Sequence, residues 1–182
     1  MKLQQEAIVA LGALKVKDAF PDLMAAVADK DPRTRAKAAQ ALWSMGGPDT
    51  KEAMPVLLPL LKDKEAGVRL NAVGALGQIG PEAGGAVPAL KSTLNDPDAY
   101  VRAQAATALG QIGQDPGSVV PALTQTLKDR DKNVRVAAAY ALGEFGENAR
   151  SAVAALNEMT RDKDGDIKTA VAFSIKAIEG RK

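Results

Sequence analysis

The chain has 182 residues, 46% of them apolar and 25% charged, which is typical of a globular protein and excludes a disordered one. It contains no cysteine and no histidine, so thiolate or imidazole catalysis, disulfide bonds and the commonest zinc ligands are excluded. The 24 basic and 22 acidic side chains are interspersed along the chain, so its net charge of +2 does not favour binding to nucleic acid.

The sequence gives no sign of a membrane segment. The longest apolar runs, such as residues 54–61, are too short and too rich in proline to span a bilayer, and the first residues do not resemble a signal peptide. We take the cytoplasm as the default compartment. Aromatic residues make up only 3% of the chain, so a core must come from closely packed helices rather than from large rings.

An internal repeat runs from the first residues to the last. The phrase Ala-Leu-Gly, with variants, recurs at intervals of 31, 34, 33, 33 and 33 residues, at positions 10–12, 41–43, 75–77, 108–110, 141–143 and 174–176. Each phrase lies in a segment with the apolar period of an α-helix, as Val101, Ala105 and Leu109 show. A shorter helix is predicted before it, for example from Val120, Leu123 and Leu127. Each unit is therefore a helical hairpin.

In chain order, the repeat predicts a lone second helix followed by five hairpins. Because one hairpin cannot bury its own apolar face, the copies must stack, and we expect an all-α, right-handed solenoid of antiparallel helix pairs. We treat residues 1–182 as one domain, with segments 1–15, 16–46, 47–80, 81–113, 114–146 and 147–182. Glycine and proline predict loops between repeats, as at Gly84-Gly85 and at Asp115-Pro116-Gly117.

Proline and aspartate mark the ends of these helices. Pro21, Pro55, Pro88 and Pro121 are each expected near the start of a first helix. Pro59 lies four residues beyond Pro55 and predicts a kink. Paired acids lie between the two helices of each hairpin, where a carboxylate can cap the free amides of the second helix. The pairs are Asp29/Asp31, Asp63/Glu65, Asp96/Asp98, Asp129/Asp131 and Asp162/Asp164.

The sequence motif of residues 98–113 resembles the short HEAT-like repeats of phycobilisome bilin lyases and of bacterial scaffold proteins. It reads Asp-x-x-Val-Arg-x-x-Ala-Ala-x-Ala-Leu-Gly-x-Ile-Gly. The resemblance covers essentially the whole chain. It implies that the basic column, formed by Arg35, Arg69, Arg102, Arg135 and Lys168, makes a ladder of ion pairs between repeats. The ankyrin motif Thr-Pro-Leu-His needs a histidine, which this chain lacks, and the tetratricopeptide motif Trp-x-x-Leu-Gly-x-x-Tyr is absent. Both of those repeat classes are therefore rejected.

Other interpretations of the repeated residues are weaker. The basic column could bind phosphates along a line, but pairing with acids explains it better. The Asp-x-Asp pairs could bind a metal ion, but helix capping explains them without the further oxygen ligands that calcium needs, so we expect no metal and no other cofactor. Gly74, Gly77 and Gly80 are spaced by three within a helix and predict close helix packing rather than a phosphate loop.

The positions that differ between repeats are the better candidates for binding. On the second helices, residues two, five and eight or nine after the basic column lie away from the apolar stripe, and in HEAT-like proteins this side lines the concave surface. Trp43, Tyr140 and Phe173 are the large side chains there. We weigh partner binding and inter-repeat packing evenly for Trp43, and we favour packing for Phe173 in the last repeat. The candidate partner-binding residues are Lys37, Gln40, Trp43, Asn71, Gln104, Thr107 and Tyr140.

These observations predict a monomeric, non-enzymatic scaffold that binds a segment of a partner protein on its concave face. Two alternatives stay open. The resemblance suggests an accessory subunit of a bilin lyase, although a chain without cysteine and histidine is poorly suited to lyase chemistry of its own. A HEAT-like protein that binds nucleic acid is disfavoured by the balanced charge.

Overall fold

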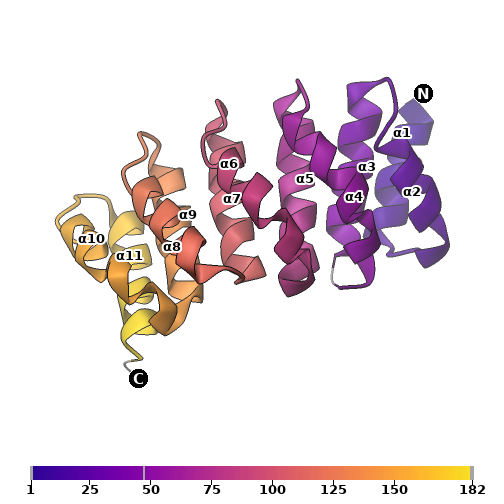
Figure 1. Cartoon of the computed structure of the whole chain (residues 1–182). Helices are drawn as coiled ribbons and strands as arrows, with labels where there is room; N and C mark the ends of the chain where they lie inside the picture. The colour runs from indigo at the N-terminus through magenta and orange to yellow at the C-terminus, as the bar shows by residue number, and fades with distance from the viewer. Residues whose placement is uncertain (1, 47, 181–182) are drawn as a thin grey trace.

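The computed structural model describes residues 2–46 and 48–180, and it is helical throughout with no strand in these residues. Figure 1 shows an elongated stack in two layers, with the two ends of the chain at opposite ends of the stack. This architecture confirms the all-α solenoid that the repeat predicts.

The second helices form one layer, and each packs against the second helix of the next repeat along its length. Each is twelve to fifteen residues long. They are α1 (Lys2–Ala13), α3 (Pro32–Met45), α5 (Ala66–Ile79), α7 (Ala99–Ile112), α9 (Lys132–Glu144) and α11 (Gly165–Glu179).

The first helices form the other layer and touch one another much less. The layer whose helices approach more closely lies on the inside of the curve, so the second helices form the concave side. The first helices are α2 (Phe20–Ala26), α4 (Met54–Leu57), α6 (Val87–Thr93), α8 (Pro116–Thr126) and α10 (Val153–Met159).

Short 3₁₀-helices precede or interrupt most of the first helices. They are η1 (Lys17–Ala19), η2 (Pro48–Ala53), η3 (Leu58–Lys62), η4 (Gly80–Ala86) and η5 (Gly146–Ala152). Pro21, Pro55 and Pro88 are the second residues of α2, α4 and α6, where the first turn does not need the missing N–H. Near Pro59 the helix changes type, since α4 ends at Leu57 and continues as the 3₁₀-helix η3. The kink predicted at Pro59 stays a prediction.

Two local predictions are wrong. Pro121 lies inside α8, which begins five residues earlier because Pro116 supplies its first turn. Gly84 and Gly85 lie in η4 rather than in an open loop, and Pro116 and Gly117 belong to α8. The segment between repeats therefore has more helical structure than its glycine and proline content predicts.

Small residues allow successive second helices to approach closely. A Cβ added to Gly77 would lie 2.9 Å from the Cβ of Ala108, and one added to Gly110 would lie 3.0 Å from the Cα of Ala141. These glycines repeat because each contact between repeats needs room for the backbone of the next helix, which confirms the packing interpretation for Gly77. It is wrong for Gly80, which follows the end of α5 with a φ of +77° and has nothing within 4 Å of an added Cβ. The core consists of fully buried Leu, Ile, Val and Ala side chains, continuous from α1 to α11.

Across residues 2–46 and 48–180, none of the helices combines the length and apolar character that crossing a bilayer requires.

Candidate partner-binding face

The arginine near the start of each second helix connects its own turn to the next repeat. Arg102 donates from Nε and Nη2 to both carboxylate oxygens of Asp129, at 2.8 and 2.9 Å. Its Nη1 donates to the carbonyl oxygens of Asp96 and Pro97, at 2.9 and 3.2 Å. One side chain therefore holds the turn that precedes its helix and the turn of the following hairpin.

We call the contact between two successive repeats a joint, and the same geometry recurs in the two preceding joints. Arg69 bonds Asp96 at 2.7 and 2.8 Å, and Arg35 bonds Asp63 at 2.7 and 3.1 Å. The Arg35 guanidinium holds the pKa of the Asp63 carboxyl below its ordinary value, chiefly through its hydrogen bonds, and Arg102 does the same for Asp129. The ion-pair ladder implied by the HEAT resemblance is present for Arg35, Arg69 and Arg102. It does not extend fully to the end of the column, because Arg135 approaches Asp162 only to 4.0 Å and Lys168 forms no ion pair among the described residues.

The second acid is the N-cap residue of each of these second helices, and its side chain caps the helix in every pair except Asp63/Glu65, where the Glu65 carboxylate accepts no capping hydrogen bond. The carboxylates of Asp31, Asp98, Asp131 and Asp164 accept backbone N–H groups of the first turns of α3, α7, α9 and α11. The first acid accepts the N–H of the second, as Asp96 does from Asp98 at 2.9 Å. Among the described residues, no group of acidic side chains is arranged to hold a metal ion. The repeated charges therefore serve folding and stacking.

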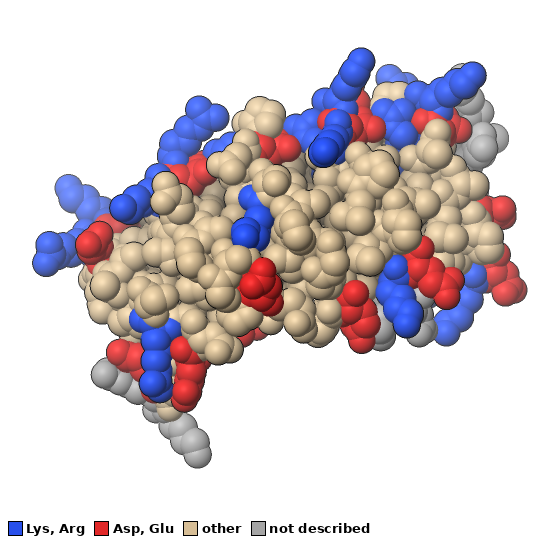
Figure 2. Space-filling view, in the orientation of Figure 1, with Lys and Arg blue, Asp and Glu red and all other residues tan. Residues whose placement is uncertain are grey.

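Charged side chains gather at the edges of the solenoid. Figure 2 shows most of the visible Lys, Arg, Asp and Glu along the upper and lower edges of this face, with a surface between them that is mostly uncharged but has basic atoms near its centre. The upper edge carries the turns within the hairpins, where the ladder lies (Figure 1). Both signs are mixed along it, so no part of this view is a continuous basic surface.

The predicted partner-binding residues all lie on second helices, but they are not equally accessible. Lys37, Thr107 and Tyr140 are exposed, and Gln40, Trp43, Asn71 and Gln104 are half-buried. They come from α3, α5, α7 and α9, so they follow the concave side across four repeats. We call the exposed and half-buried side chains of the second helices on this side the concave face.

Trp43 and Asn71 also take part in packing between repeats. The indole lies over Gly74, where an added Cβ would be 2.5 to 2.7 Å from three ring atoms. Trp43 stands where other repeats have glycine, and Gly74 stands where they have Gln40, Thr107 or Tyr140, so the two departures compensate each other. Asn71 Nδ2 donates to the Ala36 carbonyl of the preceding repeat at 2.9 Å.

Tyr140 contacts Phe173, which occupies the same position in the last repeat and for which the sequence favoured packing. Its ring centroid is 5.5 Å from that of Phe173 on α11, with the rings inclined at 55°. Phe173 is 48% exposed and Tyr140 37%, so the pair forms an aromatic surface at the C-terminal end of the concave face. Tyr100, at the start of α7, is 72% exposed and was missed. Its position two residues before the basic column varies between repeats, and that variation is the signal that would have found it.

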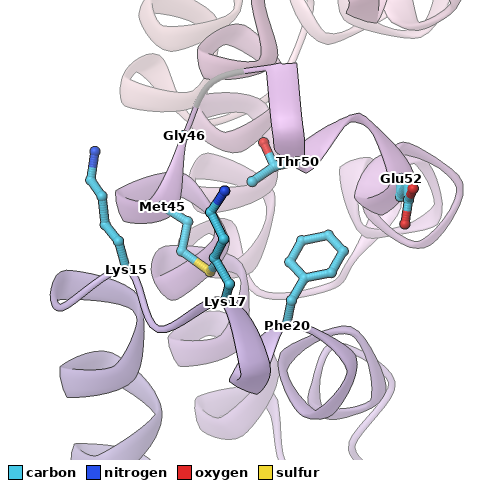
Figure 3. A pocket seen from close by; sticks show the side chains of 7 residues that line it. All are labelled: Lys15, Lys17, Phe20, Met45, Gly46, Thr50 and Glu52. Carbon is cyan, nitrogen blue, oxygen red and sulfur yellow. The ribbon is translucent and has the colours of Figure 1, made fainter.

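A cavity of about 360 Å³ lies near the N-terminal end, at the edge opposite the ladder. Figure 3 shows Phe20 and Met45 turned toward its interior, with Lys15 and Lys17 extending from one loop and Glu52 at the other side. Its apolar floor and mixed charges form no arrangement of nucleophile and base, and we assign no chemistry to it.

The fold and the ladder define the class of this chain, an α-solenoid of short helical hairpins. Comparison with protein families matches HEAT repeats at residues 2–54, 40–95 and 87–176. The chain therefore belongs to the HEAT repeat family. A comparison with the curated proteins finds no match.

Several solved structures share this fold. An engineered protein matches with a TM-score of 0.81 and 23% identity, over 99% of this chain and 93% of the other. A designed armadillo repeat protein in complex with the peptide (KR)4 matches with a TM-score of 0.77 and 17% identity, over 96% and 90%. The complex of CpcE and CpcF of phycocyanin lyase from Nostoc sp. PCC7120 matches with a TM-score of 0.68 and 23% identity, over 87% of this chain and 98% of that one.

Proposed function

We propose that this HEAT repeat protein is a non-enzymatic scaffold that holds a segment of a partner protein on its concave face. One observation carries the proposal: the contacts between repeats recur, whereas the accessible side chains of the second helices differ from repeat to repeat. Arg69 and Arg102 make the same bonds in successive joints. At the position two residues later, the same helices carry the half-buried Asn71 and Gln104, and α9 carries Ala137.

The aromatic pair gives this face the chemistry of an interface. Tyr140 and Phe173 place large, stiff, partly exposed rings beside polar side chains, and such residues dominate the binding energy of protein interfaces. A structural neighbour that binds a peptide supports a scaffold of this shape holding an extended segment. Trp43 contributes less than the sequence predicts, because part of its surface already packs on Gly74.

The test uses one substitution on each side of the solenoid. Thr107→Arg places a long charged side chain at an exposed position of the concave face, and Gln125→Arg does so at an exposed position of α8 in the other layer. Partners captured from a cell lysate should be lost with Thr107→Arg and retained with Gln125→Arg. Circular dichroism checks that both variants fold. Equal recovery with all three proteins would contradict the proposal.

A second candidate rests on the match to the phycocyanin lyase complex, which would make this chain an accessory subunit for a bilin lyase. It predicts that a free bilin changes its absorption spectrum when it is mixed with this protein. A nucleic-acid-binding function has less support, because Arg35, Arg69 and Arg102 are engaged in the ladder. It predicts DNA binding that weakens steeply with salt.

A further inference from the structure

We infer that the segment held on the concave face is an uncharged, extended stretch of polypeptide, whose backbone is bound by glutamine side chains of α5 and α7 and whose large apolar side chain packs on Tyr140 and Phe173. The inference rests on the proposed function and specifies its ligand. Three features of the described residues support it: the charges of the central helices, the partners of their carboxamides, and the aromatic pair.

The two central helices offer no charge to a ligand. Helices α5 and α7 each contain one charged side chain, Arg69 and Arg102, and both are buried in the ladder. The nearest exposed charges on this face are Lys37 on α3 and Glu144 on α9. A charged segment lying across the centre would lose hydration without gaining an opposite charge, which is costly. An uncharged segment avoids this cost.

The centre instead carries carboxamides. Among the described residues, Gln78, Gln104 and Gln111 make no hydrogen bond to another protein group, and Gln78 and Gln111 are exposed. A carboxamide has a donor and an acceptor at the same end, as a peptide unit does. Gln78 and Gln111 occupy the same position of successive repeats. Packed helices lie about 8–10 Å apart, and three residues of an extended chain span about 10 Å.

This spacing favours an extended ligand over a helical one. An extended chain of the polyproline II type has three residues per turn and a rise of about 3.1 Å per residue, so every third peptide unit faces the same side. Each such unit can reach one glutamine, and two successive repeats can therefore bind the backbone without contacting its side chains. The backbone groups of an α-helix are bonded internally and would not use these carboxamides. Asn71 is less available, because its Nδ2 is bonded to the Ala36 carbonyl.

The aromatic pair provides the side-chain specificity. The tilted rings of Tyr140 and Phe173 expose an apolar surface one and two repeats beyond Gln104 and Thr107. A leucine, methionine or aromatic side chain of the segment would be partly buried there. The ligand is therefore defined by one large apolar residue together with neighbouring residues that are uncharged.

A random dodecapeptide library displayed on phage, selected against the full chain, tests this inference. We expect the selected peptides to be uncharged and to share one large apolar residue. For a synthetic selected peptide, Tyr140→Ala and Phe173→Ala should each weaken binding about tenfold or more. Gln104→Ala and Gln111→Ala should each weaken it about two- to tenfold, whereas the control Gln125→Ala on α8 should not change it.

N-methylation of the peptide backbone tests the extended binding mode. Methylation at each residue in turn removes one N–H donor, and the loss of affinity should recur about every third residue in the part that crosses α5 and α7. Selected peptides that are charged, or that are insensitive to Tyr140→Ala and Phe173→Ala, would overturn the inference. If such peptides still lose binding with Thr107→Arg, the proposed function survives. If they do not, the proposed function fails as well.

Discussion

The joint between α7 and α9 and the joint between α9 and α11 use the same residue types but differ in structure. In the first, Arg102 is 5% exposed and bonds both oxygens of Asp129. In the second, Arg135 approaches Asp162 only to 4.0 Å, and both side chains are more exposed. An arginine in the basic column and an aspartate in the next repeat are therefore not enough to form a strong ion pair between repeats. Burial and two-point geometry are also needed.

The last joint has other contacts in place of the buried pair. Lys132 donates to Asp164 and Asp166 at 2.9 and 3.0 Å, on the surface. The buried Ser174 hydroxyl donates to the Ala139 carbonyl of the preceding second helix at 2.6 Å. An exposed ion pair contributes little to stability, so we expect the C-terminal hairpin to open more readily than the central ones.

The largest loss of stability is expected when a buried ion pair of the ladder is removed. Arg102→Ala leaves the Asp129 carboxylate without its counter-ion and should lower the free energy of unfolding by about 3 kcal/mol. Urea unfolding, followed by circular dichroism, measures this loss. A decrease below about 1 kcal/mol, the value usual for surface ion pairs, would contradict the special role of the central joints.

A somewhat smaller effect is expected at the joint between α3 and α5. Gly74→Ala places a methyl group against the Trp43 ring and should destabilise the fold by about 2 kcal/mol, despite the better helix propensity of alanine. Gly67→Ala is the matched control, because nothing lies within 4 Å of its added Cβ, and it should stabilise the same helix by about 0.5 to 1 kcal/mol. Equal effects of the two substitutions would show that the indole does not fill this space.

Acid should weaken the central joints in a defined direction. The pKa of Asp129 is lowered in the folded protein by its hydrogen bond with Arg102. The pair therefore stabilises the fold fully above the ordinary carboxyl pKa of about 3.9, and this contribution is lost as the pH falls through the lowered pKa. Unfolding measured between pH 6 and pH 2 should show a smaller loss of stability for Asp129→Asn than for the wild type. Parallel pH curves would contradict this assignment.

The smallest loss of stability is expected at the last ion pair of the ladder, between Arg135 and Asp162. Arg135→Ala should change the free energy of unfolding by about 0.5 kcal/mol or less, because its ion pair is long and partly exposed. The same urea experiment measures it beside Arg102→Ala. A loss as large as that of Arg102→Ala would remove the distinction between the two joints.

The repeated part of the molecule could be predicted from sequence because each prediction was supported by several copies. The period placed the hairpins, and the acids beside the turns predicted the caps at Asp31, Asp98, Asp131 and Asp164. The ladder followed from the HEAT resemblance. The weak ion pair of Arg135 could not be predicted, since its residue types match those of the strong ion pairs.

The parts that differ between repeats were harder to predict because they depend on a neighbour in space. Trp43 could be assigned to packing only when Gly74 was seen to lie beneath it. Phe173 and Tyr140 occupy equivalent positions of successive repeats, but only the structure shows that their rings are in contact and remain partly exposed. Tyr100 was missed because it lies before the basic column, outside the positions considered for the concave side.

The central claim is that one set of residues holds the repeats together and a different set binds a partner. Its most direct test measures the dissociation constant of a selected peptide and the free energy of unfolding for the wild type and Tyr140→Ala. We expect the affinity to fall about tenfold or more while the free energy of unfolding changes by about 1 kcal/mol or less. Unchanged affinity, together with a large loss of stability, would show that Tyr140 belongs to the architecture and would contradict the account.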